Sequence, residues 1–239
     1  GEDLLKMVGN LPYDITVKDI MNLDSSNIQP EEWEKIAETI YKYRHDFDGI
    51  VVSHGTDTMA YTASMMTFML QNIDIPVVFT GSQVPINVLL SDAPDNMKLA
   101  FAAAASLQPG IYLAFDGKVM RGCRSVKVRT TAFNAFESVN FPPVAEVTSD
   151  GLEIKLPEQW QPRQCILNTN IDTNVSLVKL FPGFDPRLLH AMAENGCHGI
   201  VIEAYGLGGM TFIRRNVAAA IGELIRKGIP VVAASQCLY

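Results

Sequence analysis

From residue 49 onward the chain alternates short runs of β-branched residues with longer amphipathic or Ala- and Met-rich segments. Gly, Pro, Asp and Asn punctuate the junctions between these segments. Runs such as GIVVSH and IPVVFTG are apolar at consecutive positions, which is typical of strands buried on both faces of a parallel sheet. The alternation therefore predicts an α/β fold in which strands and helices follow one another as βαβ units.

The first part of the chain contains most of these units. An acidic first turn after Pro30 favours the start of a helix there. The segment FDGK is expected to turn the chain into KVMRG as a hairpin. We expect strands at residues 20–23, 49–54, 75–81 and 110–117, and helices at residues 28–47, 57–72 and 93–107.

The pattern changes between residues 140 and 173, where Pro and polar residues predominate and strands plus a connector are expected. After this stretch the order β, α, β, α, β returns, with a helix expected at residues 210–228. We therefore predict a large N-terminal domain at residues 1–150 with a mainly parallel sheet flanked by helices. A linker at residues 151–173 and a smaller α/β C-terminal domain at residues 174–239 follow it.

Composition excludes several classes of protein. The net charge is -7 and the Lys and Arg residues are scattered, so neither nucleic acid nor a membrane surface is an expected partner. The most apolar window, around Phe101, is much shorter than the roughly 20 residues that cross a bilayer. Four cysteines stand singly, which argues against a zinc cluster or a disulfide scaffold, and the N-terminal residues do not resemble a signal peptide. A cytoplasmic location is expected.

Polar residues follow the strand at residues 49–54 in the order HGTDT. In an open parallel sheet, ligands bind beyond the carboxyl ends of the strands, where loops and helix N-termini expose backbone N–H groups. Thr56 and Asp57 occupy such a position. Both residue types also cap helices, and on this motif alone capping and ligand binding are about equally supported.

Three further segments place polar groups where the same edge is expected. Ser25 and Ser26 follow the strand expected at residues 20–23, although they could instead cap the helix that begins near Pro30. Ser82 follows the strand that ends in FTG. Lys127 comes after the hairpin, and a solvated surface lysine is its more common alternative.

Together these side chains suggest a hydrolytic site. A threonine hydroxyl is a poor nucleophile until a base removes its proton, and a lysine amine can be that base when burial or a nearby charge lowers its pKa. An adjacent carboxylate such as Asp57 can hold the ammonium form or a cationic group of the substrate. Other motifs are weaker: no second His lies at metal-ligand spacing from His54, and the sequence has no GxGxxG, Walker or GxSxG motif.

Five segments resemble the type I, cytoplasmic L-asparaginases: HGTDT, DSSNIQPEEW, PVVFTGSQVP, SDAPDN and VKVRTTAFNAFES. The similarity runs in order along nearly the whole chain. It implies hydrolysis of L-asparagine to L-aspartate and ammonia through a threonine acyl-enzyme, with no metal and no organic cofactor. It also implies a homodimer or homotetramer whose active sites lie near the subunit junction.

The resemblance assigns roles to individual residues. Thr56, Asp57 and Lys127 match the catalytic group, and Asp57 would also bind the α-ammonium of the substrate. The loop from Asp24 through Ser25 to Ser26 would hold the α-carboxylate, with Ser25 the clearest match. The backbone around Ser82 would face the side-chain amide.

The chain departs from the family pattern in three places. The Gly-rich TGGTI motif, whose threonine is usually assigned as the acylated nucleophile, has no match, and nothing after Tyr239 supplies the family's acidic residue for the neighbouring subunit. These two departures lead us to expect an incomplete copy that is inactive or nearly so on its own. Glu203 and Ala204 stand where some members have an allosteric Arg, and Val126 precedes the Lys, so no allosteric activation is expected.

Two other functions remain open from the sequence. The same motifs occur in the asparaginase-like subunit of a tRNA-dependent amidotransferase, although the acidic composition disfavours contact with tRNA. A non-enzymatic amino-acid-binding protein could use Thr56 and Asp57 only to hold its ligand. The preference between asparagine and glutamine depends on about 1 to 3 kcal/mol of pocket discrimination, which the sequence does not fix.

Overall fold

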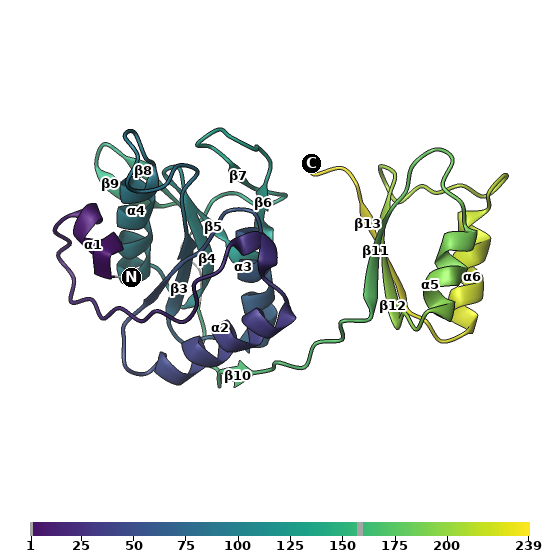
Figure 1. Ribbon diagram of the computed structural model, residues 1–239, viewed down its shortest axis with the longest axis horizontal. Coiled ribbons are helices and arrows are strands. Elements are labelled where there is room, and N and C mark those ends of the chain that lie inside the picture. The colour runs from purple at the N-terminus through teal and green to yellow at the C-terminus, as the bar shows by residue number, and fades with distance from the viewer. Residues whose placement is uncertain (1, 157–159) are drawn as a thin grey trace. The chain divides into compact units, whose positions relative to one another are not determined.

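The structure is a computed structural model that describes residues 2–156 and 160–239. It divides into two compact units, Gly1–Thr169 and Asn170–Tyr239 (Figure 1). The boundary at Thr169 lies inside the linker predicted at residues 151–173, and most of that stretch belongs to the first unit. The reason is that part of it is β-structure that pairs within the first unit. β9 (Gly151–Ile154) is paired with β8 (Ala145–Thr148), and β10 (Ile166–Leu167) is paired with β2 (Leu70–Gln71).

The first unit is built on a six-stranded sheet with the order β1-β3-β4-β5-β8-β9. Its first three strands, β1 (Ile50–Ser53), β3 (Pro76–Thr80) and β4 (Gly110–Phe115), are parallel. β5 (Lys118–Arg121), β8 and β9 continue the sheet in antiparallel order. The expected α/β fold with a parallel sheet flanked by helices is confirmed, and the far half of the sheet adds hairpins to it.

Helices cover both faces of the parallel strands. α4 (Ala93–Ser106) packs on one face, where its alanines and Leu99 meet Val78, Tyr112 and Ala114. α3 (Met59–Met69) packs on the opposite face, as Figure 1 shows. Because successive side chains of a strand point to opposite faces, a strand between two helix layers is apolar at every position, and β3 is buried throughout.

Several elements lie around this core. They are α1 (Glu2–Val8), a 3₁₀ turn η1 (Ser25–Asn27), α2 (Pro30–Tyr43), a second 3₁₀ turn η2 (Gly122–Arg124), and the antiparallel pair β6 (Ser125–Lys127) and β7 (Phe136–Ser138). The expected hairpin is confirmed: Asp116 and Gly117 both have positive φ between β4 and β5, which matches a two-residue turn of the primed type.

One expected strand is absent. Residues 20–23 are not a strand, because their backbone finds no partner for a hydrogen-bonded ladder within residues 2–156 and 160–239. The sequence prediction was wrong at this point because apolar residues alone do not supply a neighbouring strand. α1, in contrast, was not predicted.

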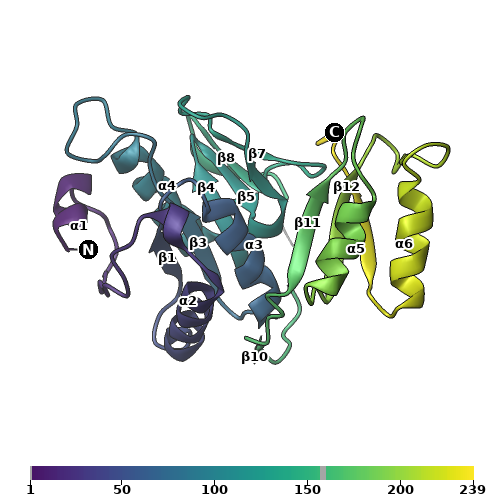
Figure 2. The same ribbon diagram turned by 45° about the vertical axis from the view of Figure 1, so that its right-hand side comes forward.

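The second unit is a three-stranded parallel sheet with two helices on one face. The order is β11 (Val175–Lys179), β12 (Gly199–Ala204) and β13 (Val231–Ser235). Figures 1 and 2 show α5 (Arg187–Glu194) and α6 (Val217–Arg226) together on the same side of these strands. α6 begins seven residues later than the helix expected at residues 210–228, because Asn216 caps it by accepting the Ala219 N–H at 2.8 Å.

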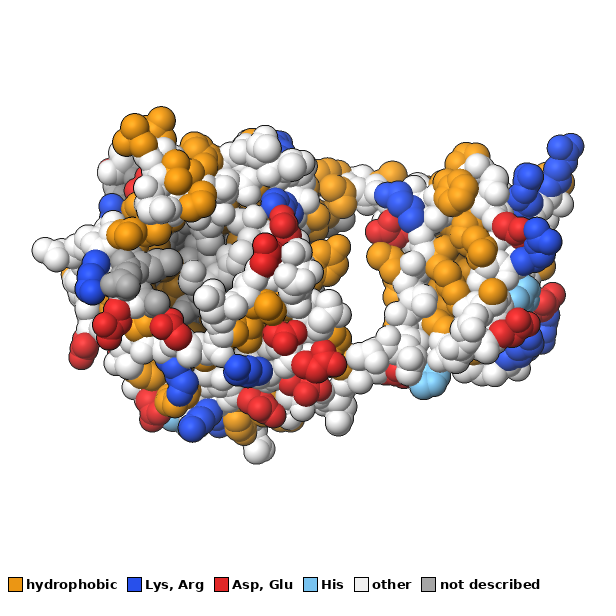
Figure 3. Space-filling view, in the orientation of Figure 1, with side chains coloured by type: hydrophobic (Ala, Val, Ile, Leu, Met, Phe, Trp, Pro, Cys, Tyr) orange, Lys and Arg blue, Asp and Glu red, His pale blue; other side chains and the backbone are white. Residues whose placement is uncertain are grey.

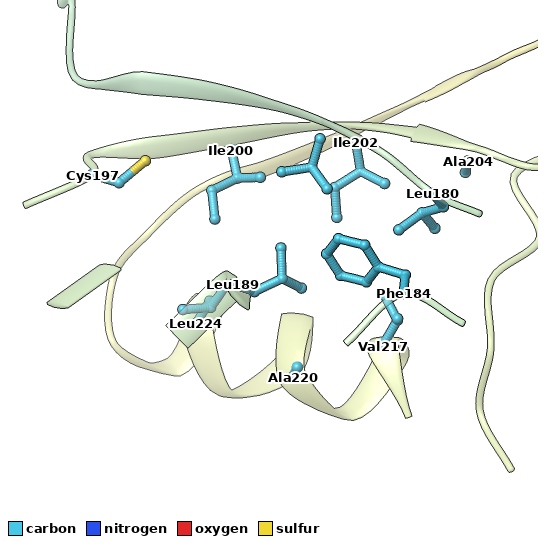
Figure 4. Close-up of a cluster of buried hydrophobic side chains, with 11 residues drawn as sticks. Leu180, Phe184, Leu189, Cys197, Ile200, Ile202, Ala204, Val217, Ala220 and Leu224 are labelled. Atoms are coloured by element: carbon cyan, nitrogen blue, oxygen red, sulfur yellow. The ribbon is translucent and has the colours of Figure 1, made fainter. Parts of the chain in front are cut away.

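The second unit has a hydrophobic core of its own. Figure 4 shows Leu189 and Leu224 of the two helices directed toward Ile200 and Ile202 of β12. Phe184 fills the space beside Leu180 and Val217.

Candidate active site

Two loops leave the sheet side by side at the carboxyl ends of β1 and β3. Ser53 is in register with Thr80, and the His54 N–H donates to the Thr80 carbonyl at 2.8 Å. A side chain at Gly81 would place its Cβ 2.2 Å from the His54 carbonyl oxygen, so only glycine fits this crossing. The HGTDT loop and the GSQ loop are therefore held against each other at one edge.

The structure brings Thr56, Asp57 and Lys127 together at this edge. The Lys127 Nζ donates to Thr56 Oγ1 at 2.9 Å and to the Asp57 carboxylate at 2.7 Å. The Lys127 side chain is 19% exposed and that of Asp57 is 64% exposed. Lys127 thus points inward to the HGTDT loop, contrary to the alternative of a solvated surface lysine.

Local packing directs Lys127 into the site. It is the last residue of β6, where it pairs with Phe136 of β7. The preceding turn η2 lies against α3, because a Cβ on Gly122 would meet the Ala63 carbonyl oxygen at 2.7 Å. β6 therefore starts beside α3, the helix that follows Thr56 and Asp57 in the chain, and Lys127 at its end comes close to these two residues.

Gln83 is a third contact of the Thr56 hydroxyl. Thr56 Oγ1 donates to Gln83 Oε1 at 3.2 Å. The Gln83 amide cannot easily turn over, because its Nε2 donates to the Thr130 carbonyl at 2.9 Å and to the Ala132 carbonyl at 3.1 Å. Asp92 fixes the backbone of the same residue by accepting the Gln83 N–H at 3.0 Å. This role of Gln83 was missed from the sequence, because it depends on the distant loop at residues 128–135; its position directly after Ser82 was the available signal.

Ser25 is buried against the HGTDT loop. Thr58 Oγ1 donates to the Ser25 carbonyl at 2.7 Å. The closest approach is at Gly55, where a Cβ would lie 2.5 Å from Ser25 Oγ. Asp24 accepts the Ser26 N–H at 2.8 Å and the Ser26 hydroxyl at 2.7 Å, and these bonds, the backbone one first, lower the pKa of the exposed Asp24 carboxyl.

Ser82 lies at the same edge, half-buried between Gly81 and Gln83. All seven residues singled out from the sequence are therefore on segments that meet at the ends of β1 and β3. The direct hydrogen bonds join Thr56, Asp57 and Lys127; Ser25 is tied to the same loop through Thr58.

Asp24 caps the 3₁₀ turn η1, but capping of the α-helices does not account for the side chains of Ser25, Ser26, Thr56 and Asp57. The residue at the N-cap of α3 is Thr58, and the hydroxyl of Thr58 bonds to Ser25. At the start of α2, the Gln29 N–H donates to Glu32 at 2.9 Å, so neither Ser25 nor Ser26 caps this helix. The Thr56 and Asp57 side chains are directed to Gln83 and Lys127 instead.

The chemistry available here is proton transfer at a hydroxyl. A hydroxyl, an amine and a carboxylate in this order can move a proton from the hydroxyl to the amine and stabilise the resulting charge. Within residues 2–156 and 160–239, no group of three or more His, Cys, Asp and Glu side chains could hold a metal ion. In the same ranges, every helix is too short or too polar to cross a bilayer.

Two family models match the chain. Residues 1–160 match the family model described as Asparaginase, N-terminal, and residues 174–239 match the Glutaminase/Asparaginase C-terminal domain. The chain belongs to the asparaginase family. Both halves of the family fold are thus represented, in the expected order.

Individual relatives of this asparaginase family member support the assignment. An L-asparaginase of Thermococcus kodakarensis is 41% identical over all of this chain and 73% of its own length, and its solved structure superimposes with a TM-score of 0.94. A Glutamyl-tRNA(Gln) amidotransferase subunit of Methanosphaera stadtmanae is 34% identical over all of this chain, which spans 57% of that relative. A structure described as a probable cytoplasmic L-asparaginase from Campylobacter jejuni is 26% identical, covers 99% of this chain and 77% of its own, and has a TM-score of 0.84.

Proposed function

We propose that the protein hydrolyses L-asparagine to L-aspartate and ammonia. The observation that carries this proposal is the convergence of Thr56, Asp57 and Lys127, with Lys127 Nζ 2.9 Å from the threonine hydroxyl and 2.7 Å from the carboxylate. The family assignment and the L-asparaginase of Thermococcus kodakarensis support asparagine as the substrate.

The reaction proceeds through a threonine acyl-enzyme. Lys127, as a neutral amine, accepts the proton of Thr56 Oγ1, and Thr56 Oγ1 accepts the proton of the oxygen that attacks the amide carbon. When the acyl-enzyme forms, the attacking oxygen is that of a threonine hydroxyl. When the acyl-enzyme is hydrolysed, the attacking oxygen is that of water. In the first step the proton on Lys127 goes to the leaving nitrogen, which departs as ammonia. In the second step it goes to the threonine oxygen that leaves the acyl-enzyme, which restores the threonine and frees L-aspartate. Asp57 stabilises the ammonium of Lys127 between the two transfers of each step.

Substrate binding uses the surrounding polar groups. Asp57 keeps most of its carboxylate exposed and binds the α-ammonium of asparagine. The loop from Asp24 through Ser25 to Ser26 binds the α-carboxylate, and the backbone around Ser82 faces the side-chain amide. No cofactor takes part in this scheme.

The proposed setting is the cytoplasm, and the proposed assembly is a homodimer or homotetramer with the site near the subunit junction. The relative from Campylobacter jejuni, described as a probable cytoplasmic L-asparaginase, supports the location. Acidic and basic side chains are interspersed on the visible face of the first unit, in keeping with a small molecule as the substrate (Figure 3).

A second candidate function is the asparaginase-like subunit of a tRNA-dependent amidotransferase. The 34% identity to the relative from Methanosphaera stadtmanae favours it. That function would require tRNA and a partner chain for ammonia release, whereas an asparaginase needs neither.

The test is ammonia release by the complete gene product from L-asparagine, L-glutamine and D-asparagine, with and without tRNA. We expect turnover of L-asparagine that tRNA does not change. Dependence on tRNA and a partner chain would favour the amidotransferase function. Binding of aspartate by calorimetry without turnover of any of the three amides would favour a binding protein.

A further inference from the structure

A chain of three side chains lies behind the HGTDT loop, and the reaction scheme above does not use it. Trp33 of α2 donates its Nε1–H to Thr62 Oγ1 at 3.0 Å. Thr62, which is completely buried in α3, has its Oγ1 2.9 Å from His54 Nε2. His54 Nδ1 lies 2.7 Å from the carbonyl oxygen of Gly55, the residue before Thr56.

The two ends of this chain fix where its protons lie. The indole N–H can only donate and the Gly55 carbonyl can only accept. The Nδ1 atom of His54 must therefore carry a proton. Burial lowers the pKa of His54, so the ring holds one proton, and Nε2 is left to accept the hydroxyl proton of Thr62. One arrangement satisfies all four groups: Trp33 donates to Thr62, Thr62 to His54, and His54 to Gly55.

We propose that His54 is a positioning residue that holds the Gly55–Thr56 peptide in place, with Thr62 fixing its tautomer. The Gly55 carbonyl and the Thr56 N–H belong to one planar peptide unit, so fixing the carbonyl fixes the orientation of the backbone that enters Thr56. The loop has little other freedom, because Gly55 is pressed against Ser25 on its other side.

This positioning matters because the Thr56 hydroxyl must meet Lys127 and Gln83 at once. If His54 Nε2 carried the proton, the bare Nδ1 would face the Gly55 carbonyl oxygen at 2.7 Å, and the two lone pairs would repel. The peptide would then turn away and carry Thr56 with it. A displacement of about 1 Å in a reacting group is enough to lower a rate by about 100-fold.

The catalytic part of this inference rests on the proposed function, so its test combines kinetics with a measurement that needs no turnover. In long-range ¹H–¹⁵N spectra of the wild-type protein, His54 should be a neutral imidazole with its proton on Nδ1. In Thr62→Val, which removes the hydroxyl at nearly constant volume, this signature should weaken or shift to the other nitrogen. A wild-type ring with its proton on Nε2, or a Thr62→Val ring unchanged from wild type, would overturn the proposal whether or not the protein is an asparaginase.

The kinetic comparison uses His54→Leu, His54→Asn and, as a matched control, His190→Leu in α5. We expect kcat of His54→Leu to fall between about 10-fold and 100-fold with a smaller change in KM. His54→Asn should recover most of the loss, because its Nδ2–H can still donate to the Gly55 carbonyl, and His190→Leu should match wild type. Wild-type kcat in His54→Leu, or no recovery in folded His54→Asn, would overturn the positioning role, whereas full turnover by Thr56→Val would overturn the proposed mechanism instead.

Discussion

At the residue scale, the amine of Lys127 bridges the two side chains of Thr56 and Asp57 that matter most for proton transfer. Lys127→Met keeps the aliphatic stem and removes the base. We expect kcat for asparagine to fall by about 10²- to 10⁴-fold, the range that a positioned acid–base group contributes, while the protein stays folded.

Lys155→Met is the matched control for this change. Lys155 makes its own ion pair with Glu153 at 2.7 Å in β9 and lies outside the proposed site. The kcat of Lys155→Met should equal that of wild type. Equal kcat values for Lys127→Met and Lys155→Met would contradict the role of Lys127.

Gly55 is the second residue on which the site depends. A methyl group there would lie 2.5 Å from Ser25 Oγ and 2.7 Å from Ser25 Cβ, so Gly55→Ala must displace the loop that carries Ser25. We expect KM for asparagine to rise, because this loop is proposed to bind the α-carboxylate. Steady-state kinetics measures KM, with Gly222→Ala in α6 as the control, where the added methyl group would meet the flexible end of the Arg226 side chain at 3.6 Å. An unchanged KM in Gly55→Ala would be inconsistent with this account.

His54 gives the protein a pH-dependent stability. Burial lowers the pKa of His54 in the folded state below its ordinary value of 6.5, so the unfolded chain binds this proton more readily. The stability that neutral His54 contributes is fully present above pH 6.5 and is lost as the pH falls below it, at up to about 1.4 kcal/mol per pH unit.

Urea unfolding of wild type and His54→Asn between pH 5 and 8 measures this contribution. The free energy of unfolding should fall more steeply toward low pH in wild type than in the variant. Parallel profiles for the two proteins would show that His54 is not the group responsible.

Individual site residues differed in how far the sequence could place them. Thr56 and Asp57 follow a recognisable strand, so their location at the carboxyl edge of the sheet could be predicted. Lys127 is 70 residues away from Asp57, and its approach depends on η2 packing against α3, which no local pattern records. The role of Gln83 could not be predicted, because its amide orientation is set by two carbonyls of a remote loop.

At the element scale, α6 shows the energetic weight of a single cap. Asn216 accepts the Ala219 N–H at 2.8 Å and starts the helix. Asn216→Ala should lower the free energy of unfolding of the second unit by about 0.5 to 2 kcal/mol. Urea unfolding measures the loss, and Asn87→Ala in the exposed loop before α4 is the control. A loss in Asn87→Ala as large as that in Asn216→Ala would contradict the capping role.

The same helix shows why element boundaries were less predictable than element types. Apolar residues continue upstream of Asn216 as far as Met210, so periodicity alone extended the expected helix to residues 210–228. The structure instead places Arg215 at a φ of 45°, which is incompatible with a continuous α-helix. The hairpin at Asp116 and Gly117 was predictable because both residue types accept the positive φ that the turn requires.

At the scale of the whole molecule, the α/β class followed from the uninterrupted apolar runs and the helices between them. The six-stranded sheet is only half parallel, because β5, β8 and β9 pair with their neighbours in antiparallel order. The break expected at residues 151–173 misplaced β9 and β10, since both pair with strands of the first unit. β9 forms a hairpin with the adjacent β8, whereas β10 pairs with the distant β2, and long-range pairing of that kind has no local sequence signal.

The central claim is that distant segments of the chain fold to bring one threonine hydroxyl to one lysine amine for catalysis. The most direct measurement is ammonia release from L-asparagine by Thr56→Val and Thr56→Ser of the complete gene product, compared with wild type. We predict a fall in kcat of at least about 100-fold for Thr56→Val and substantial activity in Thr56→Ser, which keeps the hydroxyl. Thr56→Val turning over asparagine at the wild-type rate would contradict the account.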